Sequence, residues 1–199
     1  MLVTNSKLIG TTILSVQAGG PIASITSPII DPDNLKIIAF ELEGPAAPKN
    51  GANILDVSSI REYSNLGMVV DDADEFVTAD DVIKISDVLA LNFNLIDLKV
   101  KTRKGTKLGH IQDFTVNPVD FIIQQIIVKR PPVKAFLDPE LTISRREIIE
   151  VTDYEVVVKD EEKVLKQRAE KEGFVPNFVN PFREKQPGFA PADIKQSKS

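Results

Sequence analysis

The 199-residue chain contains no cysteine and no tryptophan, and it has a single histidine, His110. Without cysteine there can be no disulfide, no catalytic thiolate and no Cys-ligated zinc or iron–sulfur site. One histidine also excludes a multi-histidine metal centre. No apolar run approaches the roughly 20 residues that a membrane-spanning helix needs. We therefore expect no cofactor, no metal site and no membrane span.

The N-terminal segment, MLVTNSKLIG, lacks the charged start and apolar core of a secretory signal, which favours a cytoplasmic location. The composition, 42% apolar and 27% charged, is typical of a globular protein. The net charge of −5 is unevenly spread. Residues 1–92 carry 5 Lys+Arg against 13 Asp+Glu, whereas residues 93–159 carry 11 against 9. The first half is thus acidic and the second mildly basic.

The sequence repeats itself, and such repeats decide the fold. At an offset of 86 the segment SVQAGGPIASITSPIIDP, residues 15–32, matches KTRKGTKLGHIQDFTVNP, residues 101–118. After a two-residue insertion the offset becomes 88, where KIIAFE from Lys36 meets QQIIVK from Gln124. The same offset aligns MVVDDADE from Met68 with VVVKDEEK from Val156. One register over about 60 residues indicates two copies of one unit.

Each copy consists of short β-branched runs separated by Gly, Pro, Asn and Asp, which is typical of short strands and turns. Gly19 and Gly105 lie where hairpin turns need a residue that tolerates positive φ. Pro32 and Pro118 end the following strand, because proline cannot donate to a central ladder. We interpret these four as structural turn residues. A copy of about 70 residues closes most economically into a small barrel, since closure removes unpaired edges.

The expected fold is therefore mainly β, with two tandem small β-barrels at residues 1–77 and 95–160. A helical linker is predicted over residues 78–94, because Thr78 can cap a helix with Asp81 and apolar residues follow at helical spacing. Residues 161–199 are predicted to form a C-terminal helix, ended by Gly173, and then an extended tail.

The order of strands, turn glycine and Asp/Asn-Pro resembles the PRC-barrel family, over most of residues 5–162. The second copy, LIDLKVKTRKGTKLGHIQDFTVNP, carries the resemblance better than the first. The family includes folds similar to the cytoplasmic part of the photosynthetic reaction-centre H subunit and to the C-terminal domain of a ribosome maturation factor. Those relatives dock onto larger assemblies, so the resemblance implies a docking surface. It supplies no catalytic residue.

Residues that could carry catalysis are few. His110 follows Gly109 inside a predicted strand, and no G-x-S-x-G elbow accompanies the serines. The acidic run DDADE, residues 71–75, lacks the glycine and distal glutamate of an EF-hand loop and is interpreted as a solvated turn. No phosphate-binding glycine loop is present. We expect no enzyme activity.

Two features suggest binding. The first is a basic hairpin around Lys101, Arg103, Lys104 and Lys107, which could neutralise phosphates, although no aromatic platform interleaves with it. The second is a Phe/Pro-rich arm in which GFVP at Gly173 is echoed by GFAP at Gly188. Proline restraint lowers the entropy cost of docking such an arm. Its candidate anchors are four phenylalanines, Phe174, Phe178, Phe182 and Phe189.

The arm could cap the chain's own barrels, or it could dock on another protein or on a second copy. Overall the sequence favours a protein-binding adaptor that assists the assembly or regulation of a complex. The alternative is an RNA- or ribosome-associated factor that binds through the basic second barrel.

Overall fold

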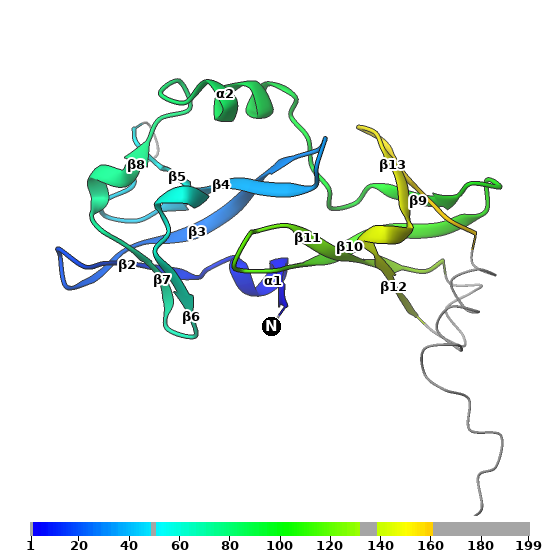
Figure 1. Cartoon of the computed structure of the whole chain (residues 1–199), viewed down its shortest axis with the longest axis horizontal. Helices are drawn as coiled ribbons and strands as arrows, with labels where there is room; N and C mark the ends of the chain where they lie inside the picture. The colour runs from blue at the N-terminus through cyan, green and yellow to red at the C-terminus, as the bar shows by residue number, and fades with distance from the viewer. Residues whose placement is uncertain (1, 49–50, 132–138, 161–199) are drawn as a thin grey trace, which may run out of the picture.

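A computed structural model describes residues 2–48, 51–131 and 139–160 of the chain. These residues are mainly β and form two curled, seven-stranded sheets, each a half-barrel, that lie side by side (Figure 1). The first sheet has the order β6-β7-β2-β3-β4-β5-β8. Its strands are β2 Thr12–Ser15, β3 Gly20–Asp31, β4 Lys36–Glu43, β5 Ile54–Asp56, β6 Glu62–Ser64, β7 Gly67–Val70 and β8 Phe76–Val77.

The second sheet repeats this plan in the order β12-β11-β10-β9-β14-β13. Its strands are β9 Lys99–Thr102, β10 Lys107–Val116, β11 Ile123–Lys129, β12 Glu140–Ser144, β13 Ile148–Val151 and β14 Glu155–Val158. In both sheets one pair is parallel, β2 with β7 and β9 with β14. The seventh strand of the second sheet is β1, Val3–Thr4, from the other end of the chain.

The strand registers confirm the repeat but move its insertion. Ile30 pairs with Ile37 as Val116 pairs with Ile123, and Ser24 pairs with Glu43 as His110 pairs with Lys129. The offset of 86 therefore holds through all of β4 and β11. The predicted change to 88 before Lys36 is wrong, because strand pairing fixes which residues are equivalent. An offset of 88 applies later, where Glu62 pairs with Val69 as Glu150 pairs with Val157.

Helices are few and short in the described residues. They are α1, Asn5–Leu8, and α2, Ile83–Ala90, besides one-turn 3₁₀ helices at Val57–Ser59, Ala73–Glu75 and Arg145–Glu147. The predicted helix between the copies is present as α2, yet Thr78 does not cap it. Thr78 and Asp81 close a turn upstream, and the N-cap is Val82, without a side-chain hydrogen bond. No described helix is long and apolar enough to cross a membrane.

The helix α2 covers the outer face of the first sheet, above the strands in Figure 1. Strand β4 carries buried residues on both faces, which explains this cover. Ile38 and Ala39 join a small cluster with Ile85 of α2, and the predicted apolar stripe of Val82, Val88 and Leu89 packs against it. The helix is therefore part of the first copy's core as well as a connection.

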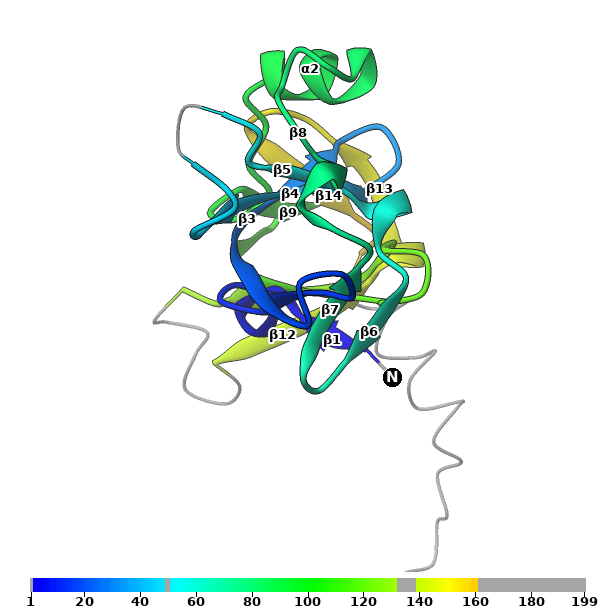
Figure 2. The same ribbon diagram turned by 90° about the vertical axis from the view of Figure 1, so that its left-hand side faces the viewer.

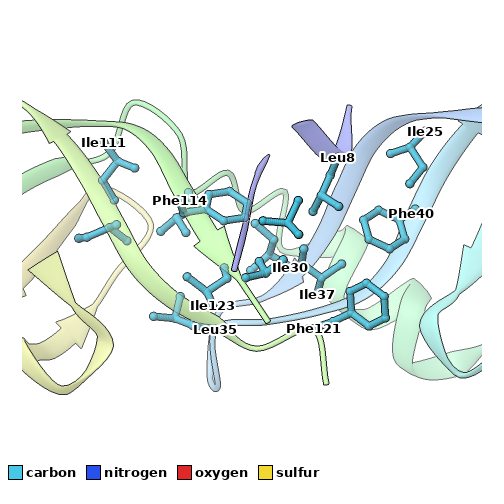
Figure 3. Packing of buried hydrophobic residues seen from close by; sticks show 14 of the residues in the cluster. Leu8, Ile25, Ile30, Leu35, Ile37, Phe40, Ile111, Phe114, Phe121 and Ile123 are labelled. Carbon is cyan, nitrogen blue, oxygen red and sulfur yellow. The ribbon is translucent and has the colours of Figure 1, made fainter. Parts of the chain in front are cut away.

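One hydrophobic core runs through both copies (Figure 3). At its centre the tip of the β3–β4 hairpin meets the tip of the β10–β11 hairpin. There the backbones of Lys36 and Ile122 form an isolated antiparallel β-bridge. The Ile37 N–H donates to the Phe121 carbonyl, and the Ile123 N–H donates to the Leu35 carbonyl, each at 3.0 Å. Since 35, 36 and 37 correspond to 121, 122 and 123 at the offset of 86, the two copies meet at equivalent positions. The contact has pseudo-twofold symmetry.

The N-terminal strand β1 strengthens this union. Val3 pairs with Val116 and Thr4 with Thr115, so the first residues of the chain complete the sheet of the second copy. Figure 2, which looks along the length of the molecule, shows β1 on the side opposite to α2. The two copies cannot be separated without breaking this pairing and dividing the shared core.

Candidate protein-docking surfaces

The four turn residues occupy the places predicted for them. Gly19 and Gly105 have φ of 67° and 85° and lie in the β2–β3 and β9–β10 turns. Gly19 N–H donates to the Ser15 carbonyl and Gly105 N–H to the Thr102 carbonyl. Pro32 follows the last residue of β3, and Pro118 comes two residues after the last residue of β10. These residues shape the hairpins and offer no chemistry of their own.

The basic hairpin is partly neutralised by its own sheet. Lys101 Nζ lies 2.6 Å from Glu155 Oε1 on the adjacent parallel strand β14, and Lys104 Nζ lies 3.9 Å from Asp160 Oδ2. Lys101 also faces Lys107 across the β9–β10 pair, while Arg103 and Lys107 are exposed. The structure thus brings the four cations to one hairpin but sets carboxylates beside two of them. Such a surface attracts phosphates less than its sequence suggests.

The acidic run has structural partners. Asp72 caps the 3₁₀ turn at Ala73, and Glu75 accepts a hydrogen bond from the Ser59 hydroxyl at 2.7 Å. Asp71 forms an ion pair with Arg61. No group of three or more potential metal ligands occurs among the residues that the structure describes. His110 lies within β10, as predicted, and the structure shows that it is exposed.

Sequence reasoning missed two exposed apolar side chains at equivalent hairpin tips. Leu66 lies at the β6–β7 tip and is 81% exposed, and Tyr154 lies at the β13–β14 tip and is 80% exposed. The two positions are related by the offset of 88. The alignment of residues 68–75 with 156–163 extends back to them, so this pair could have been found. Isolated surface hydrophobics are ordinary, but the same exposure at both equivalent tips is a shared property of the two copies.

Two grooves are also related by the pseudo-twofold symmetry. We name them the Val119 groove, of about 320 Å³, and the Arg145 groove, of about 560 Å³. Each lies between the strand that follows a 3₁₀ turn in one copy and the hairpin tip of the other copy. Their corresponding lining residues are Ile60 and Ile148, Glu62 and Glu150, Tyr63 and Val151, Pro118 and Pro32, and Phe121 and Leu35.

In its groove, the Arg145 guanidinium is held by backbone carbonyls of both copies. Its Nη2 donates to the Asn34 carbonyl at 2.5 Å, and its Nη1 lies 3.3 Å from the Leu35 carbonyl and 3.4 Å from that of Ile123. This cation from the second copy therefore holds the hairpin tip of the first. The equivalent residue in the other groove is Val57, so the two grooves occupy equivalent places in the fold but differ in size and charge.

A further cavity of about 420 Å³ lies where the copies meet beneath α2. Its lining includes the equivalent residues Asn5 and Asn92, and Ile9 and Ile96. The offset is 87 in this part of the chain, because Thr12 pairs with Ser24 as Lys99 pairs with His110. The Oδ1 atom of Asn5 is buried and has no hydrogen-bond partner among the described residues. The cavity thus lies at the junction of the two copies and is lined by residues of both.

The candidate anchors Phe174, Phe178, Phe182 and Phe189, and the predicted C-terminal helix, lie outside the described residues. No family model matches the sequence, and no match to it was found among curated proteins.

Proposed function

We propose that this protein is a non-enzymatic adaptor that binds partner proteins and helps to assemble or regulate a complex. The observation that supports this proposal is the pair of exposed apolar side chains, Leu66 and Tyr154, at equivalent hairpin tips. A few side chains that are buried in a partner's pocket account for much of the energy of protein interfaces, and tyrosine is among the commonest of them. Two equivalent tips on one rigid core would let the protein hold two sites of a complex, or two partners, at once.

The resemblance to PRC-barrel proteins agrees with a docking role, and we propose that the two copies are two tandem barrels. Each curled sheet would present its hairpin tips outward as the docking elements of one barrel. The basic hairpin is the less favoured surface, because Glu155 and Asp160 lie beside two of its four cations.

The test is affinity capture with the full-length protein, followed by quantitative mass spectrometry. We compare the wild type with the double variant L66S/Y154S and with the matched control I83S, which removes an equally exposed apolar residue from α2. Because all three sites are largely exposed, each substitution should change stability by no more than about 0.5 kcal/mol. Proteins captured by the wild type and I83S, but lost with L66S/Y154S, would support the proposal. Equal capture by all three would contradict it.

A further inference from the structure

We propose that the Val119 and Arg145 grooves are a matched pair of peptide-binding sites for Gly-Phe-X-Pro segments, and that the chain's own arm, residues 173–199, occupies them. This inference goes beyond the proposed function, because it concerns different surfaces from the hairpin tips. The folded core has two equivalent grooves, and the arm has two equivalent motifs, so each groove can take one motif.

Both grooves offer exposed apolar surface that the described residues leave uncovered. In the Val119 groove, Val119 is 88% exposed and lies beside Ile60 and Pro118. In the Arg145 groove, Leu91 and Ile149 are each about half exposed. Volumes of about 320 and 560 Å³ fall in the range of ordinary ligand pockets. A phenylalanine followed closely by a proline presents a compact apolar surface suited to such a groove.

The arm supplies that segment twice, as GFVP from Gly173 and as GFAP from Gly188. Phe174 and Phe189 are 15 residues apart, which extended chain can span over roughly 50 Å. A core of about 160 residues has a radius of gyration of roughly 15 Å and hence a diameter near 40 Å. Because the arm must follow the surface of the core, its two motifs can reach grooves of the same molecule that lie within roughly 50 Å of each other along that surface.

Charge favours the arm as well. The Arg145 groove is lined by three carboxylates, Asp33, Glu150 and Asp153, against one guanidinium that is already bound to backbone carbonyls. Residues 173–199 contain four cations and two carboxylates, a net charge of +2. A positively charged arm is thus attracted to the more acidic groove.

The occupant is the same chain, because a tethered segment meets its site at an effective concentration near the millimolar range. A separate partner that used the same grooves would have to displace the arm first. Occupation by the arm would also cover Val119, which otherwise exposes a branched apolar side chain to water.

The lack of cysteine makes the test direct. Full-length double variants combine V119C or I149C in a groove with V175C or A190C in the arm. The control replaces the groove cysteine with V16C, in the β2–β3 turn at the far left of Figure 1, which lines neither groove. Disulfide formation under mild oxidation is followed at several protein concentrations by non-reducing electrophoresis and peptide mass spectrometry.

We expect each groove cysteine to form an intramolecular disulfide with at least one arm cysteine about tenfold faster than V16C does, independently of protein concentration. Adding F174A and F189A should remove this advantage. Three results would overturn the proposal: rates equal to those of V16C, disulfides formed only between molecules, or an advantage that survives F174A/F189A. None of these results bears on capture through Leu66 and Tyr154, so the two proposals fail separately.

Discussion

Leu35 and Phe121 hold the same left-handed backbone conformation, with φ of 46° and 55°, at equivalent positions of the two copies. Both side chains are buried, and the Phe121 ring meets Phe40 edge-on, with ring centroids 5.6 Å apart. A positive φ is uncommon for residues other than glycine. It persists here because each residue turns its hairpin tip into the opposite copy, where it packs in the shared core (Figure 3).

Truncation of either residue should destabilise the whole molecule. We expect F121A and L35A each to lower the free energy of unfolding by about 3 kcal/mol, since both remove buried apolar volume. Because one core joins the copies, unfolding in urea should remain a single transition. V16A, which alters an exposed side chain in the β2–β3 turn, is the control and should have little effect. Separate transitions for the two copies would contradict the shared core.

The pairing of β1 with β10 should be needed by the second sheet. V3D places a charge at a buried position of β1 and should cost about 2 kcal/mol or more. Its effect should appear as faster amide hydrogen exchange near Thr115 and Val116, 112 residues or more away in sequence. L2D, at an exposed neighbouring site, is the matched control. Unchanged exchange in V3D would show that β1 is dispensable.

Two glycines with positive φ should differ in their tolerance of alanine. Gly109 has φ of 146°, and a Cβ there would collide with the carbonyl oxygen of Lys129 on β11, whereas a Cβ at Gly105 would meet nothing within 4 Å. Both substitutions carry a backbone cost of about 1 to 3 kcal/mol, because they force an alanine to a positive φ. G109A should cost at least about 2 kcal/mol more than G105A, because it also disrupts strand pairing. Equal melting curves would refute this close approach.

The turn before α2 should titrate at low pH. A hydrogen bond from the Thr78 backbone N–H, and a second from its hydroxyl, hold the pKa of Asp81 below its ordinary value of 3.8. The stabilisation is therefore present above pH 3.8 and is lost as the pH falls through the lowered pKa. An NMR titration of the Asp81 carboxyl should show this, and T78V should raise the pKa part of the way back. An ordinary pKa in the wild type would contradict the turn geometry.

RNA binding through the basic hairpin is the alternative, and we expect weak retention on immobilised RNA at about 0.15 M salt. The reversal R103E/K104E should change that retention little. D97N, nearby in sequence but outside the hairpin, is the control. Strong retention that falls steeply with salt and is lost in R103E/K104E would favour the RNA-associated function instead.

The strand-and-turn character of the chain and its duplication could be predicted from local sequence patterns. Turn glycines, Asp/Asn-Pro pairs and β-branched runs act through local backbone preferences, so Gly19, Gly105, Pro32 and Pro118 lie where they were predicted. The place of His110 within a strand was predicted from the same local preferences. The two-residue insertion of the second copy relative to the first was placed wrongly from the sequence. Residue similarity aligned KIIAFE with QQIIVK, whereas strand pairing aligns Ile37 with Ile123.

Tertiary structure alone decided how the copies meet. The bridge between Lys36 and Ile122, the reach of Arg145 to Asn34 and the pairing of Val3 with Val116 join residues about 85 to 115 positions apart. Local propensity carries no information about such contacts, because they depend on which buried faces fit together. The same packing creates the paired grooves, leaves Leu66 and Tyr154 in solvent, and places carboxylates beside Lys101 and Lys104. The candidate binding surfaces are therefore properties of the assembled pair of copies.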